Sequence, residues 1–185
     1  MLRRLLDNLP GDIEFRSLLG GLAADSADPM SEEMRQQLQA TWRRIQAKLP
    51  QTPFNFDFWQ VNQPRRSTYP ACRAVIAARQ LDPDKESRMI LGIQEAYYLR
   101  AQNPSDDATL IQIAVELGLD VGRFEALLNA PETQAALKNE ISQAESMGVR
   151  SFPSLVLQQG QGYWPVPVDY TGIDSMLETI EWILD

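Results

Sequence analysis

The stretch GVRSFPSLVLQQGQGYWPVPV, which runs from Gly148 to Val168, decides the fold. Its apolar run from Leu155 to Leu157 is typical of a short buried strand. Pro153 stands just before that run, where its missing N–H costs the strand no hydrogen bond. An X-Pro bond is also the only peptide bond for which the cis form is inexpensive. We therefore predict a strand that opens on a cis Phe152–Pro153 bond.

The same stretch predicts a second strand, from Tyr163 to Val168, after a turn at residues 159–162. A connection this short makes the two strands antiparallel. Pro165 and Pro167 occupy alternate positions of the second strand and donate no backbone hydrogen bond. We therefore expect the second strand to lie at an edge of its sheet.

The sequence on either side of this hairpin predicts mainly helices. Leucines share one helical face over residues 2–9, and helical patterns recur from residue 31 to residue 148 and again over residues 173–184. Apolar and polar residues alternate over residues 12–19, which predicts a strand. Two parts of a small sheet are thus separated by a long helical segment.

Composition excludes several classes of partner. The chain has 185 residues, a formal net charge of -8 and no histidine. An acidic surface disfavours nucleic acid and anionic membranes, and no window approaches the roughly 18 consecutive apolar residues of a membrane-spanning helix. The single cysteine, Cys72, cannot form a disulfide within the chain. We expect a cytoplasmic protein with no nucleic-acid and no membrane partner.

Several kinds of chemistry are missing from the sequence. Without histidine there is neither a Ser-His nor a Cys-His pair, and a zinc site of the Cys/His type is impossible. Neither the phosphate-binding nor the dinucleotide-binding glycine motif occurs, so we expect no cofactor and no metal. Cys72 stands near the start of a predicted helix, where the helix dipole and Arg73 could activate its thiol. We interpret it as a small residue packed in an apolar helix.

Three stretches together resemble the DsbA family of thioredoxin-like proteins, and most of all its cytoplasmic branch of protein-disulfide isomerases. They are LLGGLAADSADPM at residues 18–30, PRRSTYPACRAVIAARQ at residues 64–80 and GVRSFPSLVL at residues 148–157. The last corresponds to the family's cis-proline loop. The resemblance implies an α/β fold, in which a thioredoxin-like core carries a long all-helical insertion. The core would consist of residues 1–22 and 148–185, and the insertion of residues 23–147.

The resemblance also implies a function. The family catalyses thiol-disulfide exchange on protein or peptide substrates with a Cys-x-x-Cys at the start of its first helix, and it uses no other cofactor. Ser151, Phe152 and Pro153 are the implied substrate-binding residues. In this loop, the backbone groups of the residue before the cis-proline pair with a bound peptide strand.

The sequence departs from the family's pattern at its beginning. It contains no Cys-x-x-Cys, so no catalytic residue is carried over, and we expect this chain to be inactive in thiol-disulfide exchange. No capping residue precedes Leu2, so we expect Met1 to be an internal methionine of a longer protein. Two alternatives stay open. One is a non-catalytic peptide-binding module, and the other is a glutathione-dependent isomerase or transferase of the sister branch.

The missing part also affects the sheet. In the family a central strand lies between the segments that correspond to residues 13–19 and 154–158. Without it, each of these segments would have an open row of backbone N–H and C=O groups. We expect either a strand from another chain, as in a homodimer, to fill the gap, or the two segments to pair directly.

Overall fold

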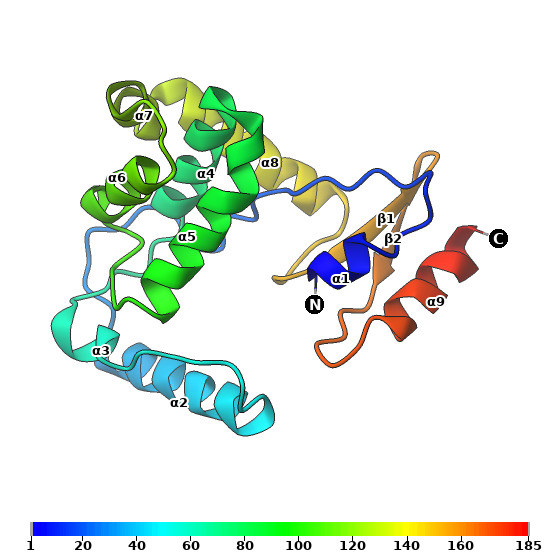
Figure 1. Cartoon of the computed structure of the whole chain (residues 1–185), viewed down its shortest axis with the longest axis horizontal. Helices are drawn as coiled ribbons and strands as arrows, with labels where there is room; N and C mark the ends of the chain where they lie inside the picture. The colour runs from blue at the N-terminus through cyan, green and yellow to red at the C-terminus, as the bar shows by residue number, and fades with distance from the viewer. Residues whose placement is uncertain (1, 185) are drawn as a thin grey trace. The chain divides into compact units, whose positions relative to one another are not determined.

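The computed structural model of the chain describes residues 2–184 (Figure 1). The chain divides into two compact units. We call residues 1–20 together with 140–185 the hairpin unit, and residues 21–139 the helical unit. Helix α8 (Pro131–Ser146) contributes residues to both. The hairpin unit therefore combines segments that lie far apart in the sequence.

The hairpin unit is built on two antiparallel strands, β1 (Leu155–Gln159) and β2 (Gly162–Val166). Gly160 opens their two-residue turn with a φ of 58°, which glycine adopts without steric cost. Within residues 2–184, β2 pairs only with β1. The prediction that this proline-containing strand lies at a sheet edge is therefore confirmed.

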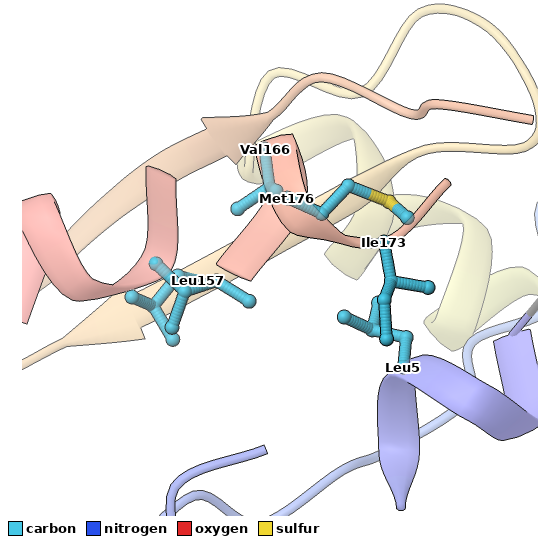
Figure 2. Packing of buried hydrophobic residues seen from close by; sticks show 6 residues of the cluster. Leu5, Leu157, Val166, Ile173 and Met176 are labelled. Atoms are coloured by element: carbon cyan, nitrogen blue, oxygen red, sulfur yellow. The ribbon is translucent and has the colours of Figure 1, made fainter. Parts of the chain in front are cut away.

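Helices α1 (Leu2–Leu6) and α9 (Asp174–Leu184) pack against one face of this hairpin. Figure 2 shows their side chains converging with those of the strands. Fully burying an aliphatic side chain stabilises a fold by about 1.5–3 kcal/mol, so this small cluster is the main source of cohesion in the hairpin unit. Its buried members are Leu5, Leu157, Val166, Ile173, Met176 and Ile180.

The strand predicted over residues 12–19 is wrong. Residues 13–22 have no regular secondary structure, and in the described part of the chain no backbone hydrogen bond joins residues 13–19 to residues 154–158. Of the two expected ways to close the gap, direct pairing of these segments is therefore wrong, and a strand from another chain stays a prediction. Ile13 instead packs against the buried cluster, and its N–H donates to the carbonyl of Pro10 at 3.0 Å. The alternating pattern correctly predicts that Ile13 is directed into the core. A strand, however, also requires a neighbouring strand to pair with, and alternation in the sequence does not show whether one is present.

The prediction that the chain is mainly helical from residue 31 onward is confirmed in the helical unit. Its segments are α2 (Glu32–Lys48), α3 (Phe58–Val61), α4 (Tyr69–Leu81), the 3-10 turn η1 (Pro83–Lys85), α5 (Glu86–Tyr98), α6 (Asp107–Glu116), α7 (Val121–Leu128) and the first part of α8. Helix α4 packs against α5, α6 and α7 and is buried along most of its length (Figure 1). It is the central helix of the unit.

The predicted α/β class is confirmed. Helices make up most of the described residues, and the sheet within these residues consists of β1 and β2. Within residues 2–184, no helix combines the length and the apolar character needed to cross a membrane.

Candidate functional site

Helix α8 ends in a motif that leads the chain into the candidate site. Gly148 has a φ of 79°, and its N–H donates to the carbonyl of Glu145 at 3.0 Å. The N–H of Val149 donates to the carbonyl of Ala144 at 3.1 Å. Together these are the two hydrogen bonds of a Schellman motif. Because only glycine adopts this conformation at little cost, Gly148 fixes where α8 stops and where the loop to β1 begins.

The loop before β1 contains the residues predicted to bind substrate. The Phe152–Pro153 peptide bond is cis. The Ser154 hydroxyl donates to the carbonyl of Ser151 at 2.6 Å. The Phe152 side chain is 44% exposed, and within residues 2–184 neither its N–H nor its carbonyl has a hydrogen-bond partner. The loop therefore presents a half-exposed aromatic ring beside open backbone groups.

The ring of Phe152 lies directly on Gly20. A Cβ atom built on Gly20 would come 2.0 Å from both Cε1 and Cζ of that ring, far inside any tolerated contact. The φ of Gly20 lies outside the left-handed region, so an alanine would meet no backbone strain there. A side chain at position 20 would therefore force the ring of Phe152 to move, but it would meet no strain in its own backbone.

Glu140 holds the segment on which that ring lies. Glu140 is only 6% exposed, and its Oε2 atom accepts a hydrogen bond from the backbone N–H of Leu19 at 2.8 Å. A buried carboxylate that accepts a backbone N–H makes a strong, charge-assisted hydrogen bond. The contact joins α8 to the residue that immediately precedes Gly20. Glu140 thus positions Gly20, and Gly20 makes room for Phe152.

Neither Glu140 nor Gly20 is predicted from the sequence as part of the site. Glu140 does leave a signal, because it falls among Leu137, Ile141 and Ala144 on the apolar face of α8. A carboxylate on such a face indicates a buried polar partner. Gly20 leaves no comparable signal, since a glycine beside another glycine equally predicts an ordinary turn.

The reactive half of the family's site is not found among residues 2–184. The sequence has one cysteine, and Cys72 lies half-buried in α4 of the helical unit. No group of three or more His, Cys, Asp or Glu side chains in the described residues could hold a metal ion. That no residue of this chain is catalytic stays a prediction.

A polar cavity of about 350 Å³ lies in the helical unit, and Arg65 and Arg73 line it. Arg73 is buried and donates to the carboxylate of Asp25 at 2.7 Å, and to Gln134 at 2.9 Å. Arg65 pairs with Asp106 at 3.2 Å. Both guanidinium groups thus already have acceptors within the helical unit.

The family model described as "Thioredoxin" matches residues 1–163 of the chain. Among curated proteins, the chain is 28% identical over 124 residues to the ClpXP adapter protein SpxH of Halalkalibacterium halodurans, which covers 67% of the chain and 40% of that protein. It is 24% identical over 135 residues to SpxH of Bacillus subtilis, covering 72% of the chain and 45% of that protein. The chain thus spans less than half the length of these relatives.

A solved structure gives the same fold over nearly all of the chain. The cytosolic disulfide reductase DsbM from Pseudomonas aeruginosa superposes with a TM-score of 0.74 at 22% identity. The match covers 99% of this chain and 89% of the reductase. At this level of identity the likeness establishes a shared fold.

Proposed function

The chain belongs to the thioredoxin family, whose model matches residues 1–163, and on that basis we propose its function. The chain binds an extended polypeptide at the loop formed by Ser151, Phe152 and Pro153. The observation that carries this proposal is the half-exposed ring of Phe152 beside a backbone N–H and carbonyl that have no partner among the described residues. A bound strand would satisfy these backbone groups, and its side chains would contact the ring.

The curated relatives support a role in binding. They are named as adapter proteins, and binding a protein requires no reactive cysteine. Residues 1–185 contain one cysteine, Cys72. A single thiol cannot alternate between a dithiol and an intramolecular disulfide. The proposed role for these residues is therefore polypeptide binding without turnover, and the proposed location is the cytoplasm.

Thiol-disulfide exchange is the second candidate function. It is favoured by the likeness to a disulfide reductase over nearly the whole chain. It would require a cysteine pair outside residues 1–185 that lies next to the loop formed by Ser151, Phe152 and Pro153. Under this candidate the loop would bind the same class of partner, a protein or peptide with a thiol or disulfide.

Binding is tested with the full chain and a fluorescently labelled, reduced and alkylated insulin B chain as the extended probe. We expect Phe152→Ala to weaken binding about tenfold, which corresponds to the loss of roughly 1.4 kcal/mol of contact. Phe15→Ala is the matched control, because Phe15 has a similar exposure of 42% in the same unit. Equal affinities for the wild-type chain and Phe152→Ala would refute the docking proposal.

Turnover is tested in a separate assay, in which the 185-residue protein is added to intact insulin and the reduction of the insulin disulfides is followed. We expect no rate above background. A robust rate that disappears in Cys72→Ser would overturn the non-catalytic role and make Cys72 the reacting group. Binding without turnover and turnover without specific binding are thus distinct results.

A further inference from the structure

An apolar groove of about 460 Å³ lies within the helical unit, between α2 and α5. We call it the α2–α5 groove. Leu91 is 54% exposed at its α5 side, and Leu99 is 42% exposed at the end of that helix. Large apolar side chains left this open around one groove are typical of a surface that binds another molecule. The groove is lined chiefly by Leu38, Trp42, Ile45, Leu91, Tyr98 and Leu99.

The floor of the groove is preformed by packed aromatic rings. Trp42 is 3% exposed and stacks on Phe54, with ring centroids 4.9 Å apart and an interplanar angle of 21°. Tyr97 meets Trp42 edge-on at 5.3 Å. Burial raises the pKa of both Tyr97 and Tyr98, which disfavours the ionised form of their hydroxyl groups. A rigid floor of this kind lowers the entropic cost of binding.

The α2 edge of the groove is positively charged. Helix α2 carries four basic residues, Arg35, Arg43, Arg44 and Lys48, against Glu32 and Glu33 in its first turn, although the whole chain has a net charge of -8. Thr41 lines the groove, and the Arg44 guanidinium donates to its hydroxyl at 2.9 Å. Lys48 follows one turn later on the same side of the helix. Arg44 and Lys48 stand at the rim of the groove, and among the described residues that line it Glu95, on the α5 wall, is the one that carries a charge.

We propose that the α2–α5 groove binds an amphipathic helix whose apolar face fills the groove and whose acidic residues lie along Arg44 and Lys48. The apolar positions of α2 from Leu38 to Ile45 extend over about 10 Å, or two turns of a helix. A helix that places residues i, i+3, i+4 and i+7 in such a groove is a recurrent mode of recognition. The proposal is independent of the Phe152 loop, because it rests on different residues.

The probes are two synthetic helices of about 14 residues, or four turns. Both carry Leu at i, i+3, i+4 and i+7; one has Glu at the flanking positions and the other has Lys. Fluorescence anisotropy with the full 185-residue chain measures the two affinities. We expect the Glu probe to bind about tenfold more tightly than the Lys probe, with a difference that shrinks at high salt. The double variant Arg44→Glu/Lys48→Glu should reverse this preference.

A matched pair of neutral variants locates the binding surface. Leu91→Asn removes an apolar side chain from the groove, whereas Val115→Asn changes a residue of similar exposure, 56%, on α6. We expect Leu91→Asn to weaken the Glu probe about tenfold and Val115→Asn to leave it unchanged. Phe152→Ala should also leave it unchanged.

Three results would overturn the proposal. The first is equal affinity for the Glu and Lys probes at low salt, and the second is unchanged binding in Leu91→Asn. The third is a chain that binds neither probe but forms a dimer that Leu91→Asn dissociates, as measured by sedimentation. That last result would assign the groove to a second copy of the chain.

Discussion

The helical unit and the hairpin unit satisfy their backbone groups in different ways. In the helical unit the helix caps are local: Ser31 caps α2 through the N–H of Met34, and Asp120 caps α7 through the N–H of Arg123. In the hairpin unit the irregular segment before Gly20 has a distant partner. The N–H of Leu19 is satisfied by Glu140, which lies 121 positions further along the chain.

This difference predicts which of the two units unfolds more easily. A helix whose bonds and caps lie within a few residues forms wherever its apolar face is covered. The hairpin unit instead depends on a small cluster in which Leu5 from α1 must reach Ile173 before α9. Within residues 2–184, β1 also has a strand partner on one side only. The hairpin unit should therefore open more easily than the helical unit.

The largest effect is expected from matched leucine truncations in the two units. Leu110 in α6 is 0% exposed and Leu5 in α1 is 2% exposed. We expect Leu110→Ala to cost about 3–5 kcal/mol of unfolding free energy and Leu5→Ala only about 2–3 kcal/mol, because a short helix at the border of a small cluster can relax into the cavity. Native-state hydrogen exchange measures the two units separately. Equal costs, or a more protected hairpin unit, would contradict the comparison.

An intermediate effect is expected at the contact between Gly20 and Phe152. Gly20→Ala places a methyl group inside the ring of Phe152, which should cost the hairpin unit about 1–3 kcal/mol. In a Phe152→Ala background the ring is gone, so the same change should be nearly neutral. Urea unfolding of the two single variants and the double variant measures this coupling. Additive costs would show that the ring does not lie on Gly20.

The sequence predicts most of the fold but only part of the site. The hairpin, its edge strand and the helical character of residues 31–148 follow from patterns within a few residues, such as the apolar run at Leu155–Leu157. The strand expected over residues 12–19 fails because a strand needs a partner elsewhere in space. Gly20 and Glu140 escape prediction for the same reason, since each is defined by a contact more than 100 residues away in sequence.

The smallest effect is expected at Asp169, whose carboxylate connects the end of β2 to the start of α9. It accepts the hydroxyl of Thr171 at 2.6 Å, the N–H of Thr171 at 2.7 Å and the hydroxyl of Ser175 at 3.2 Å. The Thr171 hydroxyl, followed by the Thr171 N–H, lowers the pKa of Asp169 from 3.8 to about 2. Because the folded pKa is the lower one, the carboxylate stabilises the fold above about pH 4 and this contribution disappears as the pH falls toward 2. We expect Asp169→Asn to lower the melting temperature slightly at pH 7 and not at pH 2, whereas Glu178→Gln, a control on the exposed side of α9, should change it at neither pH. A carboxyl pKa near 3.8 for Asp169, measured by NMR titration, would show that this loop is not organised by Asp169.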